Sequence, residues 1–349
     1  MYPGVVNTRY DQDIAITRTP LQFILWALGA ILVFAVMPLT LSGYWLNFFT
    51  FILIAVVATL GLHILTGLCG LISLGHAAFM AVGAYVCGIL ASTYELPFWV
   101  TIPCAGIGAG LVGLFFGAPS LRIKGLYLAM STFAAQFIII WIIKHTDTIT
   151  GGNEGLFLPY VQLGSRELDS ALESYVFTAV VTIIMTFLAM NIARTRIGRA
   201  FIAIRDNDHA AEVMGVNVFG YKLLAFFIGC SFAGVAGALW AYLLVYLQPL
   251  HFGLEQSIWF LGMIIVGGLG STLGAILGAG FIEALDMGSD LLAGEIGDVF
   301  PSLAGMISSA SGFIVFALVI IIFLVFEPRG LAHRWQLIKN SYRLWPYSY

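Results

Sequence analysis

The sequence predicts an all-α protein, a polytopic membrane helix bundle of about eight full spans, or about eight to ten once a glycine-broken segment is counted. Three observations predict this class. Of the 349 residues, 60% are hydrophobic and only 9% are charged, and the mean hydropathy is +0.98, which excludes a water-soluble globule of this length. Apolar runs of about 20 residues, enough to cross a bilayer, recur along the chain. Lys and Arg gather in a few of the connections.

The chain divides into a polar N-terminal tail, a membrane domain and a basic C-terminal tail, at residues 1–20, 21–326 and 327–349. Pro20 suits the first position of a helix. Between the tails, a long apolar region interrupted by glycines covers 257–285. The uninterrupted apolar runs predict full spans at 21–41, 44–65, 71–92, 97–118, 125–144, 173–192, 223–247 and 312–326.

The basic residues predict how the spans are oriented, because cytoplasmic connections carry an excess of Lys and Arg. Arg122 with Lys124, the stretch 193–222 and the C-terminal tail are then cytoplasmic. Counting spans back from Arg122 puts the N-terminus in the cytoplasm as well. The C-terminal tail reaches that side only if 257–285 enters and returns, as a re-entrant pair or as two short spans.

The stretch 193–222 has the pattern of two short helices that lie on the cytoplasmic face. Ile197, Ala200, Phe201 and Ile204 form one apolar stripe at helical spacing, and the arginines lie away from it. Asp208 is expected to cap a second short helix, which Gly215 would end in the left-handed conformation. We interpret the pair as a docking surface. The alternative is an ordinary basic loop that only fixes orientation.

Two segments inside the apolar body, 67–79 and 267–278, are broken by glycines and carry polar side chains. Non-helical backbone is tolerated at membrane depth only where it is buried in protein or lines a wet cavity, and transporters often place their substrate at such breaks. Ser73 and His76 are expected on one face of a helix that begins at Leu71. The alternative is that the glycines serve helix packing and the polar groups bond to neighbouring helices. The candidate translocation-path residues are Ser73, Gly75, His76, Gly268, Ser271 and Thr272.

Several motifs are absent from the sequence. It has no GxxxxGK[ST] phosphate loop, no HExxH and no paired Cys/His ligand spacing, so we expect no ATP site, metal site or cofactor. No reactive cluster indicates an enzyme. Intramembrane carboxylates are scarce, which disfavours a proton-coupled single-chain carrier.

Seven strings, in order and with matching spacing, resemble the permease subunits of branched-chain amino-acid ABC importers, and specifically the M-type subunit. The resemblance covers roughly residues 46–331. The strings are GLISLGHAAF at 70–79, LRIKGLYLA at 121–129, TGGNEG at 150–155, IGRAFIAIRD at 197–206, AGVAGA at 233–238, IVGGLGS at 265–271 and EPRGL at 327–331.

The resemblance implies the chain's partners and location. A second, homologous permease would complete the path, two cytoplasmic ATPase subunits would hydrolyse ATP, and a periplasmic binding protein would capture the substrate. The chain would be a multi-pass protein of a bacterial or archaeal inner membrane, with both termini cytoplasmic and no nucleic-acid partner. The default cargo is branched-chain amino acids. Urea, short amides and other amino acids stay open, as does a secondary carrier.

The resemblance also assigns roles to residues. The stretch 193–222 would be the element that couples the ATPases to the membrane domain. The loop 146–172 would face the periplasm and meet the binding protein. The residues expected to couple are Gly198, Arg199, Arg205, Asp206, Asp208 and Gly215. Those expected at the binding protein are Gly151, Gly152, Asn153 and Glu154.

Overall fold

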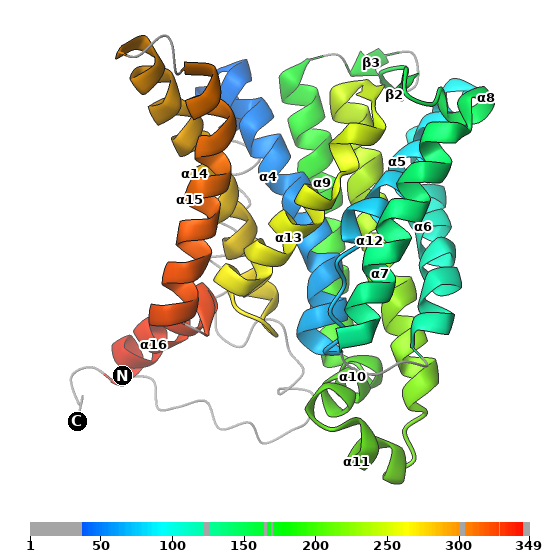
Figure 1. Ribbon diagram of the computed structural model, residues 1–349, viewed down its shortest axis with the longest axis vertical. Coiled ribbons are helices and arrows are strands. Elements are labelled where there is room, and N and C mark those ends of the chain that lie inside the picture. Colours follow the sequence, from blue (N-terminus) through cyan, green and yellow to red (C-terminus); the bar gives the residue numbers. More distant parts are fainter. Residues whose placement is uncertain are drawn as a thin grey trace.

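The computed structural model describes residues 37–121, 126–163, 166–168, 170–299, 304–327 and 329–344. It shows an all-α bundle, which confirms the predicted fold class (Figure 1). Within the described residues, five helices are long and apolar enough to cross a membrane, or up to seven if each of two bent helix pairs counts as one span. The larger predicted number of spans therefore stays a prediction. Most of the predicted span 21–41 lies outside the described residues.

The elements follow one another with short connections. The helices are α3 (Met37–Thr40), α4 (Gly43–Leu62), η2 (His63–Leu68), α5 (His76–Ser92), α6 (Phe98–Ser120), α7 (Leu126–His145), α8 (Asp147–Thr150), α9 (Ala171–Arg194), α10 (Arg196–Asp206), α11 (Asp208–Val213), α12 (Val218–Leu244), η3 (Pro249–Phe252), α13 (Leu254–Gly267), α14 (Thr272–Val299), α15 (Ala304–Phe326) and α16 (Gly330–Leu344). Two small antiparallel pairs join β1 (Leu156–Phe157) to β4 (Tyr246–Leu247) and β2 (Val161–Leu163) to β3 (Arg166–Leu168).

Helix α12 lies at the centre of the bundle and packs against α4, α5 and α6. Small residues let the backbones approach closely, as is common between helices in lipid. A Cβ atom on Gly83 of α5 would collide with the backbone of Gly234 in α12, and one on Gly237 would collide with the carbonyl of Met80. On the other side, a Cβ on Gly61 of α4 would lie 2.6 Å from the Gly229 carbonyl oxygen. These contacts fix the spacing of α4, α5 and α12.

The span predicted at 71–92 begins later than expected. The continuation of α4 is a π-helical turn, η2, and Gly70 then takes a φ of +74°, which ends the helix. Residues 70–75 run without helical structure before α5 starts at His76. Ser73 and His76 therefore do not share a helical face, and that expectation was wrong.

The glycine-broken region turns back on itself. Helices α13 and α14 meet at a bend of 120°. The connection at 268–271, hereafter the return turn, has φ values of +110° at Gly268 and +86° at Gly270, which favour glycine. The chain thus changes direction sharply at these glycines, and the predicted re-entry into the membrane stays a prediction. Helix α14 continues to Val299, well past the predicted end at 285.

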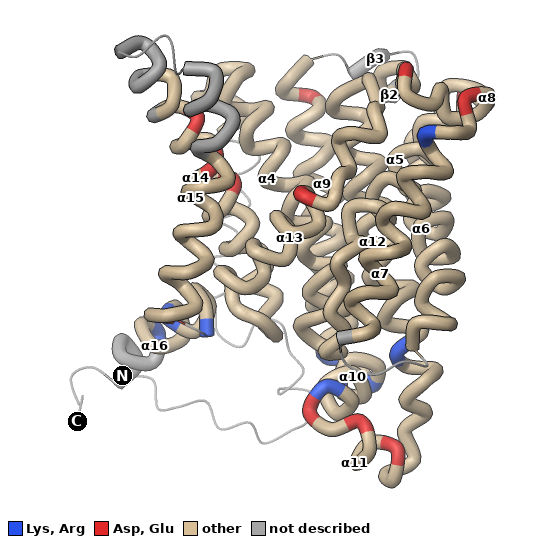
Figure 2. Tube along the Cα trace, viewed as in Figure 1, with Lys and Arg blue, Asp and Glu red and all other residues tan. Residues whose placement is uncertain are grey.

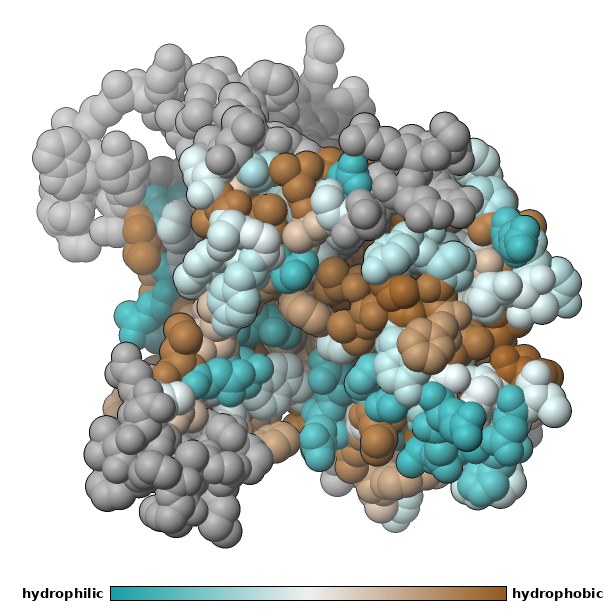
Figure 3. Space-filling view, turned by 90° about the horizontal axis from the view of Figure 1, so that it is seen from above, coloured by the Kyte–Doolittle hydropathy of each residue, from teal (hydrophilic) through white to brown (hydrophobic). Residues whose placement is uncertain are grey.

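Charge separates the two ends of the bundle. Most described Lys and Arg residues lie at the end that carries α10 and α16 (Figure 2). The opposite end, seen in Figure 3, mixes polar and apolar side chains around the ends of the helices. Arg122 and Lys124, on which part of the predicted orientation rests, lie outside the described residues, as do the tails 1–20 and 345–349.

Candidate functional site

Helix α10 is amphipathic, as its spacing predicts. Phe201 and Ile204 are fully buried, and Ile197 packs against the same core. Arg199 is exposed on the opposite face. Gly198 is buried where α10 meets the end of α9, and a Cβ there would lie 2.6 Å from the carbonyl oxygen of Ala193. Gly198 thus permits the sharp turn that lays α10 across the end of the bundle.

Helix α11 forms the outer tip of the same loop (Figure 1). Its N-terminal cap is Asn207, whose side chain accepts a hydrogen bond of 3.0 Å from the Ala210 amide. The expectation that Asp208 is the cap was therefore wrong. Asp208 instead pairs with Lys222, at 3.4 Å. Gly215 ends the segment at φ +86°, as predicted.

Arg205 joins this loop to the broken segments of the membrane domain. Its Nη1 donates a 2.9 Å hydrogen bond to the carbonyl oxygen of Gly67 in η2. The same atom lies 3.0 Å from where a Cβ on Gly270 would stand, so Arg205 also reaches the return turn. Its Nε and Nη2 donate to Asp206 at 3.1 and 3.0 Å. We call the bond between Arg205 and Gly67 the Arg205 contact.

The two broken segments meet beneath Arg205. A Cβ on Gly67 would lie 3.1 Å from the amide nitrogen of Gly270. Nearby, Thr272 Oγ1 lies 3.5 Å from Nε2 of the buried His63. Gly268 is in van der Waals contact with Gly330 at the start of α16, where a Cβ would lie 2.5 Å away. Gly268 and Thr272 thus belong to a tight junction of η2, α13, α14 and α16, and Ser271 Oγ accepts from the Gly274 amide at 3.2 Å.

The other predicted path residues have different partners. His76 Nε2 donates to the Ala58 carbonyl at 2.9 Å, and a Cβ on Gly75 would collide with the carbonyl of Thr132 in α7. Ser73 Oγ is buried and has no hydrogen-bond partner among the described residues. The structure thus packs His76 against α4 and Gly75 against α7, and not against the return turn.

The start of α5 is held by side chains from distant helices. Ser257 Oγ accepts from the Ala77 amide and Gln136 Oε1 accepts from the Ala78 amide, both at 2.9 Å. Gln136 Nε2 in turn donates to the Phe252 carbonyl at 2.7 Å. These buried bonds satisfy two of the amide groups that a helix start leaves open. The sequence alone gives no way to pair these residues.

The loop at 151–154 lies at the end of the bundle opposite α10 (Figure 1). Gly151 and Gly152 have φ values of +72° and +54°, and Asn153 and Glu154 are exposed. The carbonyl of Glu154 accepts a 2.6 Å hydrogen bond from Tyr246, next to the pairing of β1 with β4. The predicted contact residues therefore form an ordered surface turn.

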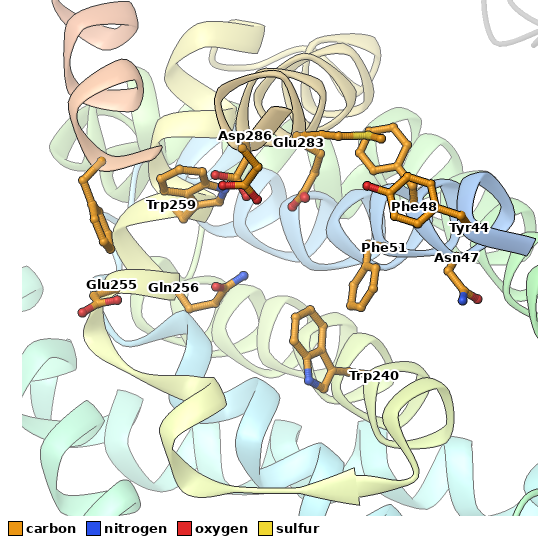
Figure 4. A pocket seen from close by; sticks show the side chains of 13 residues that line it. Tyr44, Asn47, Phe48, Phe51, Trp240, Glu255, Gln256, Trp259, Glu283 and Asp286 are labelled. Carbon is orange, nitrogen blue, oxygen red and sulfur yellow. The ribbon is translucent and has the colours of Figure 1, made fainter. Parts of the chain in front are cut away.

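A cavity of about 660 Å³ lies between α4, α12, α13, α14 and α15, in the half of the bundle away from α10 (Figure 4). We call it the chamber. Aromatic rings form much of its wall, including Phe51, Trp240 and Trp259. Its carboxylates are Glu255, Glu283, Asp286 and Asp290.

The sequence contained one signal for the chamber. Glu283, Asp286 and Asp290 are spaced i, i+3 and i+7, so they lie along one face of α14. The aromatic walls come from helices far apart in sequence, and only the fold brings them together.

The apolar helix bundle, with an amphipathic helix lying across one end, defines a multi-pass membrane protein. The chain belongs to the family described as branched-chain amino acid transport system / permease component, whose model matches residues 44–324. The previously stated resemblance is thereby confirmed.

Three relatives illustrate the similarity. The high-affinity branched-chain amino acid transport system permease protein LivM of Escherichia coli (strain K12) is 31% identical over 277 residues, covering 72% of this chain and 65% of its own length. LivH of Salmonella typhimurium, from the same kind of system, is 27% identical over 315 residues, covering 83% and 93%. The autoinducer 2 import system permease protein LsrC of Shigella flexneri is 27% identical over 237 residues, covering 64% and 60%.

Proposed function

We propose that the chain is a transmembrane permease subunit of an ABC importer for branched-chain amino acids in a bacterial or archaeal inner membrane. A second permease completes the path, two ATPase subunits bind on the cytoplasmic side, and a periplasmic binding protein delivers the substrate. Family membership supports this function, and the LivM and LivH relatives support the substrate.

The observation that carries the proposal is the Arg205 contact. If α10 only set the orientation of the chain in the membrane, it would need no hydrogen bond to the interior of the helix bundle. Here the last turn of α10 is hydrogen-bonded to the carbonyl of Gly67 and lies against Gly270. A force on α10 is therefore transmitted directly to η2 and the return turn, which are the irregular segments of the membrane domain.

The outer surface of the loop suits a protein partner. Val213 and Met214, at the tip of α11, are 88% and 83% exposed and are apolar. Glu212, next to them in sequence, is an exposed charge, and Arg199 is exposed on α10. An apolar centre with a polar rim is typical of a protein interface. The α11 tip is therefore the part of the loop that an ATPase groove receives.

The proposed orientation follows from charge. The basic end, with 193–222 and the termini, faces the cytoplasm, while 146–172 faces the periplasm with Asn153 and Glu154 exposed to the binding protein. Urea, short amides and other amino acids are the alternative cargo on the same architecture. A single-chain secondary carrier is the remaining alternative.

Purification and reconstitution test the proposal. The full chain, extracted from native membranes in mild detergent, should retain a second membrane chain and ATPase subunits. Proteoliposomes of that complex should take up leucine only with internal ATP and the external binding protein. A chain that purifies alone, and transports leucine on an ion gradient without ATP, would be a secondary carrier instead. Val213→Asp should release the ATPases, while Ile149→Asp, an equivalent change at an exposed residue on the opposite end, should not.

A further inference from the structure

Helix α16 leaves the bundle where a long apolar helix ends. Helix α15 has 23 residues, so it extends about 35 Å and crosses a hydrocarbon layer of about 30 Å by itself. It exposes apolar side chains as far as Phe326. The axis of α16 is bent from that of α15 by 49°, and α16 runs sideways from the end of α15, away from the centre of the bundle (Figure 1). Helix α16 thus begins at the surface of the bilayer and points outward over the lipid.

One face of α16 is apolar, and protein covers only the beginning of that face. Leu331, Trp335 and Ile338 are spaced i, i+4 and i+7, which places them on one side of the helix. Leu331 packs against the hydrophobic core of the bundle. Trp335 and Ile338 follow on the same side and are 54% and 62% exposed. The apolar face therefore turns toward the membrane domain at its start and continues, exposed, beyond the edge of the bundle.

Basic residues flank the apolar face of α16 (Figure 2). Arg334 and Lys339 lie on either side of it at helical spacing, and both are exposed. Arg334 also pairs with Glu327 at the end of α15. The sequence from 328 to 349 contains Arg329, Arg334, Lys339 and Arg343 but no Asp or Glu. A helix with an apolar face and a strongly basic remainder is typical of segments that lie in the headgroup layer of a membrane.

We infer that α16 lies in the headgroup layer at the basic end of the bundle and binds anionic phospholipids there. Trp335 and Ile338 enter the boundary between headgroups and acyl chains, and Lys339 contacts the lipid phosphates. Charge complementarity and the position of α16 beside an apolar helix favour a bilayer surface over a protein as the partner. The proposed ATPase contact, the α11 tip, lies apart from α16 (Figure 1).

The start of α16 connects the lipid contact to the return turn. A Cβ on Gly330 would lie 2.5 Å from the Cα of Gly268, and a Cβ on Gly268 would lie 2.8 Å from the carbonyl oxygen of Arg329. The two backbones are therefore in direct contact. A helix held in the headgroup layer thus holds the return turn at a fixed distance from the bilayer surface.

Nitroxide labels on opposite sides of α16 test its position. Ile338→Cys and Gln336→Cys are made in the full chain with Cys104→Ser, which removes the one cysteine of the four that is not buried. In vesicles of phosphatidylcholine and phosphatidylglycerol, the label at 338 should be more accessible to oxygen, which dissolves in the bilayer. The label at 336 should be more accessible to a water-soluble nickel chelate. Equal accessibility of both labels to the nickel chelate would overturn the inference. Trp335→Cys replaces Ile338→Cys if that variant does not fold.

Native mass spectrometry of the full chain tests the preference for lipid charge. The chain should retain phosphatidylglycerol in preference to phosphatidylcholine. Lys339→Gln combined with Arg343→Gln should lower that preference by about fivefold or more, since one basic residue near an anionic surface contributes about that factor. Arg196→Gln, which removes an exposed charge from α10 at the same end of the bundle, is the matched control and should leave the α16 contribution in place. An unchanged preference in the folded double variant would refute binding by α16.

A protein partner on α16 would give a different pattern. The label at 338 is therefore measured in the chain alone and in a complex with the proposed ATPase subunits. Shielding from the nickel chelate in the chain alone, with oxygen still reaching the label, supports a lipid contact. Shielding from both reagents only when the ATPases are bound would show that protein covers this face, and would reject the inference while keeping the proposed function.

Discussion

Reversing the charge of Arg205 is the sharpest test of coupling. In Arg205→Glu the donor to Gly67 is replaced by a carboxylate, so two acceptors face each other, and the new side chain also lies beside Asp206. The buried stripe of Phe201 and Ile204 is untouched. We therefore expect the α10 helix to fold and the ATPases to bind, while motion of α10 no longer reaches the membrane segments.

The structure bounds the size of the effect. A hydrogen bond from a charged group contributes about 1.5–3 kcal/mol, and the exposed pair with Asp206 contributes about 0–1 kcal/mol. The Arg205 side chain is 36% exposed, which favours the lower part of that range. A loss of about 2 kcal/mol is small beside the stability of about 5–15 kcal/mol typical of a folded domain. It nevertheless shifts an equilibrium between two states of the junction roughly thirtyfold.

The assay measures leucine uptake and ATP hydrolysis in the same proteoliposomes. Arg205→Glu should lower the number of leucine molecules transported per ATP by roughly tenfold or more, with the complex intact by size-exclusion chromatography. Arg196→Gln, which removes an exposed charge from the same helix without the bond to Gly67, is the matched control. Uptake per ATP at the parental value in Arg205→Glu would refute the coupling role of the Arg205 contact.

Three further predictions follow from local geometry. Asn207→Ala should lower the free energy of unfolding by about 1 kcal/mol through loss of the α11 cap, and more than Asp208→Ala does, as measured by thermal melting; equal effects would return the cap to Asp208. Gly75→Leu should prevent assembly rather than block transport, because its Cβ collides with α7, and an assembled complex with normal ATPase activity would contradict this. Asn153→Cys should react with an impermeant thiol reagent only from outside intact cells, and Val213→Cys only in inverted vesicles; the reverse pattern would invert the topology.

Much of the fold could be predicted from apolar runs and their spacing. Helices α6, α7 and α9 begin and end within a few residues of the predicted spans, because each is a continuous apolar run between polar connections. The apolar stripe of α10 could be predicted from its helical spacing. The break at the return turn was also predictable, since glycines interrupt the apolar region 257–285.

The remaining features depend on contacts between segments far apart in sequence. Glycines marked a break near the start of the run 71–92 but did not show where the helix begins. It begins at His76 because Gly70 takes a left-handed conformation beside Arg205. Asp208 and Asn207 are both good capping residues, and propensity cannot choose between neighbours. The chamber is lined by residues from several helices, such as Trp240 of α12 and Glu283 of α14, and no local sequence pattern predicts that they lie around one cavity.

The glycine contacts between α5 and α12 have a mechanical consequence. Side chains can change rotamer when two helices slide past each other, but two backbones in direct contact cannot adjust in this way. Such contacts join Gly83 to Gly234 and Gly237 to Met80. We therefore expect α5 and α12 to move as one rigid body. Helix α14 is held to α13 in the same way, because a Cβ on Gly278 would collide with the Met263 carbonyl and one on Gly274 would lie 2.7 Å from the Gly267 carbonyl oxygen. We therefore expect relative motion to occur between pairs of helices that make no such glycine contacts, and each glycine-joined pair to move as one body.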